Sequence, residues 1–497
     1  MKNIFCTEFY RKYYPVILCF VLMFLHFLSA YPGGMTIDSF SQYEQSISGN
    51  YFSHHPPLMS MVWSLLNYIY QGPQIMLLLH LAFLWGGVLL LFYADPQNKY
   101  RYLYFVIPFL PNILAQSSII WKDIGFGLGS FFVVSSCVFY SYRQKRPSCL
   151  VVMGLLLILF YVVGVKFQAQ FIVPILVLFV VSVSLKAIDN PTNITSSSQV
   201  SLQEATLVAT KQSTKMARKR LLRRTPLLLA MMNVNMLWLK SSLVSYNWFI
   251  RILVSAVLSL AIIYGNNQLA KHFSTDSHAN QLRQLFDIAG VSVAIDNDDL
   301  LPDYVKEDKN LYSFEKLKTL YTPTLVNYLV FGDNRIYNST SDPVKLQELE
   351  SSYIKAVTHY PLAFLKHRMR NFILLMKSSG YSSDDLFIDP NEAQKHNIDI
   401  ENSCLKNVIV KYLKTYPRIL TINLISFILI LVYLTAILKN KQSNNPEKII
   451  LTYIVVIGFV FSVVLFFATM ACDYRYYYVI RVLTLFSLPV YLKFRYS

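Results

Sequence analysis

Charged residues are scarce in this sequence. Asp, Glu, Lys and Arg make up 15% of the 497 residues, whereas an ordinary soluble domain carries roughly a quarter. Hydrophobic residues make up 54% and are grouped into runs long enough to cross about 30 Å of hydrocarbon as helices. The deficit of charge therefore indicates that lipid, rather than water, surrounds much of the chain.

Acidic residues are fewer than basic ones, which gives a formal net charge of +17. Such an excess can mark a nucleic-acid-binding protein. Here, however, the basic residues lie mainly in short segments between the apolar runs, where the positive-inside rule of membrane proteins places them. We therefore expect the charge to set the membrane topology, and we expect no nucleic-acid partner.

The six cysteines lack the spacing of a metal site. Most of them lie in or near apolar runs. Only Cys404 and Cys472 fall in segments expected on the outer side of the membrane, so a disulfide between them is a hypothesis. The sequence contains no internal repeat that we can detect.

Ten apolar runs predict about ten transmembrane helices. They cover approximately residues 14–30, 74–93, 102–120, 124–142, 149–165, 171–185, 248–264, 419–438, 450–471 and 479–492. The first run is either a signal peptide or a retained span, and we favour the span because others follow it. The shorter stretch 227–239 predicts an interfacial helix. The fold class expected is an all-α polytopic membrane protein.

The topology divides the chain into three parts. Residues 1–265 form an N-terminal transmembrane module with a first outer loop at 31–73 and a basic cytoplasmic linker at 187–226; residues 266–416 form a mixed, mostly helical extracytoplasmic insertion; residues 417–497 form the last transmembrane helices. Lysines and arginines then place both termini in the cytoplasm. We expect a multi-pass protein of the bacterial inner membrane.

Unusual polar residues gather on the outer side of this topology. They are Asp38, Glu44, His54 and His55 in the first loop, Lys122 and Asp123 at the second turn, Lys166, Gln168 and Gln170 at the third, and Asp473 and Arg475 at the last. Ionisable residues beside membrane spans are energetically expensive and often functional. Each has a structural interpretation when taken singly, but their coincidence on one face favours a shared site.

Asp38 and Ser39 are expected to begin a helix at the bilayer surface, after the turn allowed by Gly33-Gly34. Asp38 is then either a helix cap or a functional carboxylate. His54 and His55 are either interfacial residues or part of the site, and an adjacent pair is weak evidence for a metal because further ligands must come from elsewhere.

Two other segments also leave two interpretations open. Trp121-Lys122-Asp123 is either a turn with an internal charge pair or a functional site. Residues 353–377 predict an amphipathic helix whose basic end holds His367, Arg368 and Arg370. That helix is either structural or lies on the membrane beside an acceptor.

The layout resembles the GT-C superfamily of membrane glycosyltransferases, which use polyprenyl-phosphate sugars. The residues that carry the resemblance are Pro32-Gly33-Gly34, Asp38-Ser39, Gln42, Gln45, His55-Pro56-Pro57, Trp121-Lys122-Asp123 and the motif residues between His359 and Arg368, which resemble a bacterial subgroup of GT-C-like proteins. The resemblance implies a polyprenyl-phosphate sugar donor and an envelope glycan, lipid or protein acceptor. The general layout covers most of the chain, and the specific motifs cover a small part of it.

In the superfamily, the acidic residue of the first loop serves the acceptor or a metal, and the match falls on Asp38. Transfer requires a base for the acceptor hydroxyl and cations for the leaving phosphate. Lys122 and Arg475, with Lys166 or His55 in reserve, are expected to bind the phosphate, and Asp123 to orient Lys122. We also expect Glu44 and His54 near the substrate. Many members carry two adjacent acidic residues, so Asp38-Ser39 leaves a divalent metal cofactor undecided.

A transporter or flippase of lipid-linked saccharide or another anion is the alternative. It predicts polar residues at mid-membrane depth and broken helices. The apolar runs instead contain few polar residues, and the polar groups lie near one edge of the membrane, which favours an enzyme. A structural partner in an envelope assembly is a third interpretation, and tolerance of Asp38 replacement would support it.

Overall fold

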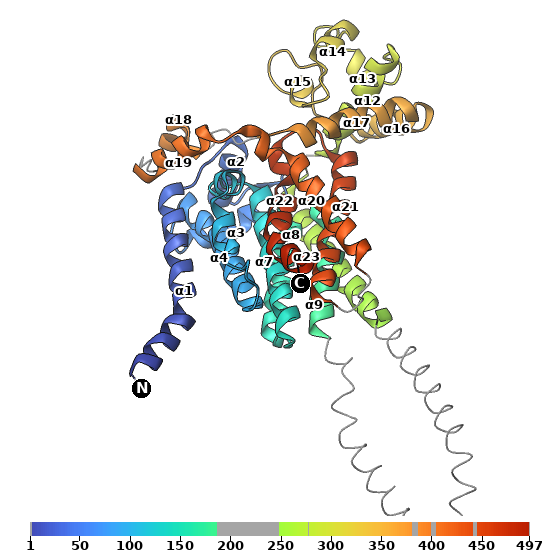
Figure 1. Ribbon diagram of the computed structural model, residues 1–497. Coiled ribbons are helices and arrows are strands. Elements are labelled where there is room, and N and C mark those ends of the chain that lie inside the picture. The colour runs from blue at the N-terminus through green and yellow to red at the C-terminus, as the bar shows by residue number, and fades with distance from the viewer. Residues whose placement is uncertain are drawn as a thin grey trace, which may run out of the picture.

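The computed structural model describes residues 2–185, 248–276, 278–379, 386–398, 404–440 and 445–496. The linker expected at 187–226 and the apolar stretch 227–239 lie outside the described residues. The described chain is mostly α-helical (Figure 1), and its two short strands, β1 (Tyr51–Phe52) and β2 (Ser274–Thr275), pair in parallel. The expected all-α class of membrane protein is confirmed at this level.

Six helical segments within the described ranges are long and apolar enough to cross a membrane. They are Tyr13–Ala30 of α1 (Lys2–Ala30), α4 (Pro73–Ala94), α7 (Lys122–Arg143), the helix Trp248–Phe273, α21 (Pro446–Ala468) and Tyr474–Tyr496, which comprises η6 (Tyr474–Tyr477), α22 (Tyr478–Phe486) and α23 (Leu488–Tyr496). Shorter apolar helices are α3 (Leu58–Asn67), α8 (Cys149–Val165), α9 (Val173–Ser184) and α20 (Asn423–Lys439).

Helix α7 lies at the centre of the bundle, against α4, α8, α9 and α22. Small residues allow the helices to approach closely, as is usual in membranes. A Cβ atom added at Gly87 of α4 would lie 2.4 Å from the ring of Phe131, and one added at Gly127 would lie 2.7 Å from Tyr478. These glycines therefore set the spacing of the central helices.

The run at 102–120 does not form the single helix expected from its hydropathy. It is divided into α5 (Leu103–Val106), η1 (Ile107–Phe109) and α6 (Pro111–Ser117). Pro108 and Pro111 explain the interruption, because proline removes a backbone donor and clashes with the preceding helical turn. The pieces still return the chain from one end of the bundle to the other, where Ile119 bridges to Gly34.

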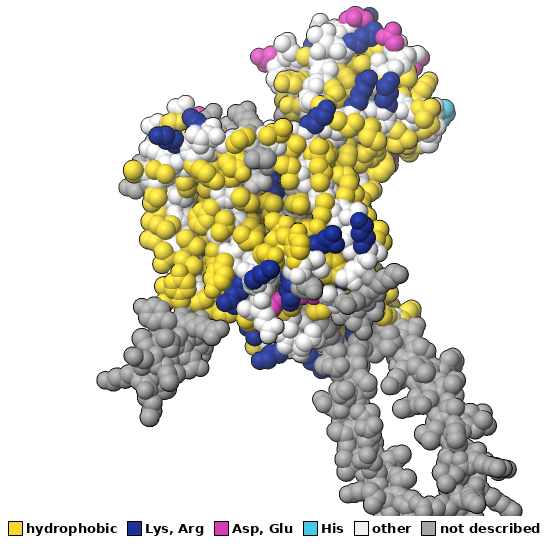
Figure 2. Space-filling view, in the orientation of Figure 1, with side chains coloured by type: hydrophobic (Ala, Val, Ile, Leu, Met, Phe, Trp, Pro, Cys, Tyr) yellow, Lys and Arg dark blue, Asp and Glu magenta, His cyan; other side chains and the backbone are white. Residues whose placement is uncertain are grey.

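The two ends of the bundle differ. At the basic end, Lys493 Nζ lies 2.5 Å from Asp95 and 2.8 Å from Glu447. The opposite end, here called the site end, carries α2 (Ile37–Ser48) and the start of α7. Figure 2 shows a broad hydrophobic belt on the flank between the two ends, with Lys and Arg gathered below it. This is the surface expected of a protein set in a bilayer.

A second hydrophobic core lies beyond the site end, in a part here called the head (residues 280–377) (Figure 1). It contains α12 (Asn280–Ile295), α13 (Asp303–Lys306), α14 (Phe314–Leu320), α15 (Asn327–Val330), α16 (Pro343–His359) and α17 (Pro361–Lys377). The helix Trp248–Phe273 leads into the head and runs past residue 265, where the sequence suggested a boundary.

The segment after the head returns to the bundle. Helix α19 (Cys404–Thr415), preceded by α18 (Pro390–Lys395), packs against α1 and α6, and η5 (Arg418–Thr421) leads into α20. Cys404 and Cys472 are both free thiols. The hypothesis of a disulfide between them is wrong, because Cys472 Sγ instead lies 3.3 Å from the carbonyl oxygen of Asn371.

Candidate functional site

Helix α2 holds Asp38 at the site end. The helix begins at Ile37, and the hydroxyl of Ser39 accepts a 3.2 Å hydrogen bond from the backbone N–H of Thr36 and donates a 2.6 Å bond to the carbonyl oxygen of Ile120. Trp121 Nε1 donates to Thr36 Oγ1 at 2.8 Å. Thr36 and Ser39 therefore anchor the start of the helix, and the Asp38 carboxylate is left for other partners.

The turn before α2 depends on glycine. Gly33 has a φ of +115°, a conformation that other residues rarely adopt, and an added Cβ would lie 2.7 Å from Ile120. Gly34 then exchanges backbone hydrogen bonds with Ser118 and Ile120, at 2.9 Å each. The loop from α1 is thereby fixed against the segment that precedes α7, which brings Asp38 next to Lys122.

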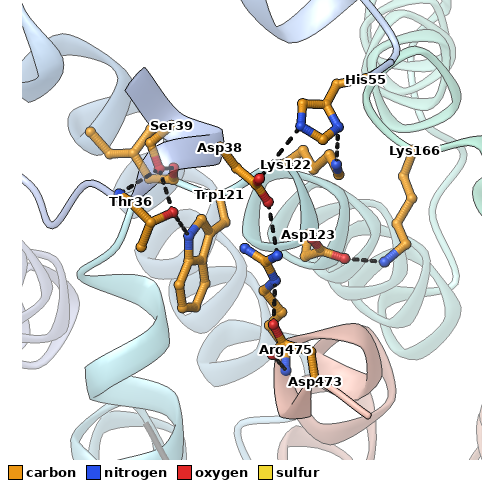
Figure 3. A network of polar contacts seen from close by, with 11 residues as sticks. Thr36, Asp38, Ser39, His55, Trp121, Lys122, Asp123, Lys166, Asp473 and Arg475 are labelled. Atoms are coloured by element: carbon orange, nitrogen blue, oxygen red, sulfur yellow. Dashed lines mark hydrogen bonds and ion pairs between the residues drawn. The ribbon is translucent and has the colours of Figure 1, made fainter. Parts of the chain in front are cut away.

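The Asp38 carboxylate has partners from two distant segments (Figure 3). Its Oδ2 lies 2.8 Å from an Arg475 guanidinium nitrogen, and its Oδ1 lies 3.6 Å from His55 Nε2. Lys122 Nζ donates to His55 Nδ1, so the other ring nitrogen of a neutral His55 carries the proton that faces Asp38. The structure thus brings together the four residues Asp38, His55, Lys122 and Arg475.

Asp123 does not orient Lys122, contrary to the sequence-based expectation. Its carboxylate accepts a hydrogen bond from Lys166, at the end of α8, and both side chains are buried. The reason is the helical period: adjacent residues point about 100° apart. In the first turn of α7, Lys122 therefore faces His55 while Asp123 faces Lys166.

Arg475 bridges two carboxylates. Besides Asp38, its Nε lies 2.9 Å from Asp473 Oδ2, and Asp473 also accepts a hydrogen bond from the backbone N–H of Arg475 at 3.0 Å. The guanidinium carbon lies 4.9 Å from the centre of the Trp121 ring. Asp473 was recognised in the sequence but was not assigned to the site, and the structure adds it.

The cations control the protonation of the carboxylate. Burial alone would raise the pKa of Asp38, but the polar contact with His55 and the charges of Lys122 and Arg475 outweigh it and hold that pKa well below its ordinary value. Burial and the charge of Lys122 lower the pKa of His55 to about 4, against the opposing effect of Asp38. At neutral pH, Asp38 is therefore ionised and His55 is neutral.

A cavity of about 1950 Å³ opens over these residues. Its polar floor is lined by Asp38, His54, His55, Lys122, Lys166, Asp473 and Arg475. Its roof comes from the head, with Asn280, Gln284, Asn327 and Glu350. One wall is apolar and descends along α21 and η2 (Phe167–Phe171), with Phe167, Phe171, Phe459, Val463 and Phe467.

The apolar wall is the part of the site that sequence reasoning missed. Val463 is 55% exposed and Phe467 is 46% exposed, although α21 reads in sequence like any other membrane span. Gln168 and Gln170, noted in the sequence but not assigned to the site, also line the cavity. Nothing in the hydropathy of a span distinguishes residues that face a cavity from residues that face lipid.

Glu44 does not belong to the cavity. Its side chain is 50% exposed and pairs with Lys395 at 3.0 Å. It follows Asp38 by six residues on α2, which places the two side chains about 120° apart around the helix. Contrary to the sequence-based expectation, Glu44 therefore lies outside the lining of the cavity. His54 does line the cavity, and its ring centre lies 4.8 Å from that of His55.

No group of three or more His, Cys, Asp or Glu side chains that could hold a metal ion occurs within the described ranges. Around Asp38, the nearest groups are cations and a histidine that Lys122 already engages. The residues at this position therefore do not fit a divalent metal.

Comparison of the chain with protein-family models, with curated proteins and with solved structures found no match.

Proposed function

We propose that the chain is a membrane glycosyltransferase of the GT-C type, which transfers a sugar from a polyprenyl-phosphate donor to an envelope glycolipid, polysaccharide or protein. The observation that carries the proposal is the composition of the cavity. Two carboxylates, those of Asp38 and Asp473, and three cationic side chains form one end, and an apolar wall descends along α21 from there. A lipid with a phosphate and a sugar at its head complements this arrangement, because its phosphate suits the cations and its apolar chain suits the wall.

The donor enters with its chain along the apolar wall. Phe459, Val463 and Phe467 offer the chain a surface at the depth of the bilayer, and burying it there is favourable by about 25 cal/mol per Å² of apolar area. The phosphate reaches Arg475 and Lys122, which form charge-assisted hydrogen bonds with its oxygens. The sugar then lies beside Asp38.

Asp38 acts as the general base. It takes the proton of the acceptor hydroxyl while that oxygen forms a bond to the anomeric carbon of the sugar. The bond between the anomeric carbon and the phosphate oxygen breaks, and polyprenyl phosphate leaves with the bonding electron pair, stabilised by Arg475 and Lys122. Because the residues do not fit a divalent metal, this sequence of steps uses the side chains of the chain alone.

The free site holds Asp38 in a weakly basic state, because Arg475 and Lys122 lower its pKa. When the donor phosphate binds, Arg475 exchanges its contact with Asp38 for a contact with the phosphate. The loss of a positive partner raises the pKa of Asp38 and makes it a better base. Binding of the donor phosphate therefore activates the carboxylate.

The proposal includes a topology. The chain crosses the bacterial inner membrane ten times, with the broken segment 95–121 as the third crossing, both termini in the cytoplasm and the site end outside. Lysine and arginine at the basic end, seen below the belt in Figure 2, support this orientation under the positive-inside rule. The head follows the helix Trp248–Phe273 at the site end, as an outer insertion requires.

Ligand-induced stabilisation tests the binding part of the proposal. We expect polyprenyl phosphate to raise the melting temperature of the detergent-purified protein more than polyprenol, because only the phosphate engages the cations. Arg475→Gln should reduce that difference, because only Lys122 is then left for the phosphate. Lys411→Gln, which changes an exposed cation of α19 outside the cavity, is the matched control and should keep it. Equal stabilisation by the two lipids in the native protein would contradict the proposal.

A further inference from the structure

One side of α17 is apolar and exposed. Leu362 is 81% exposed, Leu365 44%, Met369 49% and Ile373 44%. At about 100° per residue, the four side chains fall within an arc of roughly 80°. The opposite side of α17 faces the interior and is occupied by Phe364, His367, Arg368 and Asn371. The exposed arc is therefore a continuous stripe, and it is separate from the face that packs into the head.

The same arc contacts the membrane-spanning helices at the far end of α17. Phe372 lies beside Leu365 on the helical wheel, and its ring centre lies 5.8 Å from that of Phe466 and 6.5 Å from that of Phe427. Met376, on the same arc, is buried in the core of the bundle. The stripe thus faces the side of α17 on which α20 and α21 lie. Its first half, at Leu362 and Leu365, extends beyond these two helices.

Two hydrogen bonds fix the level of α17. Arg368 donates to the carbonyl oxygen of Thr469, directly after the last residue of α21, at 2.7 Å. Asn423, the first residue of α20, donates through its amide to the carbonyl oxygen of Leu375 at 2.9 Å. Helix α17 therefore lies across the ends of two apolar helices, where the belt of Figure 2 stops and the head begins (Figure 1).

The stripe has a basic border. Lys366, Arg370 and Lys377 are exposed and lie about 40° to 80° from Leu362 around the helix. Helix α17, which is described throughout, contains no Asp or Glu. Long basic side chains beside an apolar stripe can reach lipid phosphates while their stems stay on the apolar surface.

We infer that α17 is an interfacial helix whose stripe is covered by phospholipid, with Lys366 and Arg370 on anionic headgroups. Two observations favour lipid over a protein partner: the stripe continues a face that already meets the spans, and its charge complements an anionic membrane surface. Because α17 also carries part of the core of the head, the bilayer surface then sets the height of the cavity roof. The inference does not depend on the chemistry proposed for the cavity.

Lipid quenching of a fluorophore on the full chain tests this inference. The protein is reconstituted in nanodiscs of phosphatidylcholine and phosphatidylglycerol, with an NBD group on Leu365→Cys or Met369→Cys. All native cysteines except the buried Cys19 and Cys137 are replaced by serine. The control is Glu315→Cys on α14, at the far side of the head (Figure 1), where the side chain is 84% exposed.

We expect phospholipids with a nitroxide on the acyl chain to quench NBD at 365 and 369 at least twofold, and to leave NBD at 315 unchanged. All labelled positions are exposed, so melting temperatures equal to that of the parent protein are expected and confirm that each variant is folded. Quenching at 365 and 369 that is no greater than at 315 would overturn the inference.

Discussion

Two Asp–His–Arg clusters among the described residues have different surroundings. They are Asp38, His55 and Arg475 at the floor of the cavity, and Asp287, His367 and Arg368 in the head. The Asp38 side chain is 30% exposed, whereas that of Asp287 is 0% exposed. The chemical groups are the same, so the residue types alone do not distinguish a functional cluster from a structural one.

The head cluster is closed by its neighbours. His367 Nε2 lies 3.2 Å from Asp287 Oδ1, and His367 Nδ1 shares a 2.6 Å hydrogen bond with the hydroxyl of Tyr321. Gly290 leaves the space that the His367 ring occupies, because an added Cβ would lie 2.2 Å from it. Arg368 also binds the segment after α21. This cluster joins the head to the bundle, and its side chains are fully buried.

The cavity cluster, in contrast, is open to a ligand. Its members come from α2, the loop before α3, and η6, and they meet at a surface that a ligand can reach. Access, and not composition, is the property that separates the two clusters. The following predictions test that difference, from the largest expected effect to the smallest.

Asp38→Asn should reduce sugar transfer by about 10²- to 10⁴-fold, the usual contribution of a general base. It should lower the melting temperature less than loss of the buried Asp287 carboxylate does, because Asp38 is partly exposed and Arg475 keeps its contact with Asp473. The measurement is the initial rate in membrane vesicles that contain the cell's own lipid-linked sugars, with melting temperature determined in parallel. A variant that transfers at the native rate would remove Asp38 from the mechanism.

Asp287→Asn should show the reverse. Loss of one partner from a buried ion pair typically costs about 3–5 kcal/mol, so we expect a large drop in the melting temperature with a native transfer rate per folded molecule. Thermal unfolding and the rate, both normalised to folded protein, provide the test. If the rate fell while the stability stayed native, the head cluster would be functional and the comparison would fail.

Arg475→Gln should weaken donor use by roughly tenfold, equal to about 1.4 kcal/mol, and should shift the acid limb of kcat/KM to higher pH. Arg475 lowers the pKa of Asp38, so its loss raises that pKa. A higher pH is then needed before Asp38 loses its proton and can act as a base. Arg475→Lys keeps the charge and should keep the limb near its native position. An acid limb that is identical in Arg475→Gln and native protein would rule out the exchange of partners.

His55 should make the folded protein sensitive to mild acid. Its pKa is about 4 in the folded chain and about 6.5 when unfolded. Between these values only the unfolded state gains the proton, so stability falls as pH falls from 7 to 5, by roughly 2 kcal/mol. His55→Gln should lose correspondingly less stability over this window in denaturant melts. Equal losses in the two proteins would show that His55 is not held neutral.

Hydrophobic runs in the sequence predicted most of the apolar helices correctly, because burial in lipid leaves a strong signal. The third run was the exception. Its composition is that of a span, but Pro108 and Pro111 lie inside it, and their effect on helical hydrogen bonds outweighs hydropathy. The helical period could also have been used to exclude Glu44. Asp38 and Glu44 are six positions apart, which places them on different sides of one helix.

Which side chains of the site contact each other was less predictable from the sequence than which residues lie at the site end. Sequence placed Asp38, His55, Lys122 and Arg475 on one side of the membrane, and the structure brings them together. It could not assign Asp123 to Lys166, because that contact depends on the rotation of α7 relative to α8. The apolar wall of the cavity and the closed head cluster likewise depend on packing between distant segments.

The most direct test of the central claim is a mass-spectrometric comparison of envelope glycans. The cells carry the native chain, no chain, Asp38→Asn, or Glu44→Gln as the matched control, which changes an exposed carboxylate on the same helix outside the cavity. We predict that deletion and Asp38→Asn lose the same sugar-sized mass increment and that Glu44→Gln keeps it. If Asp38→Asn kept the increment that deletion removes, the cavity would not be a glycosyltransferase active site based on Asp38.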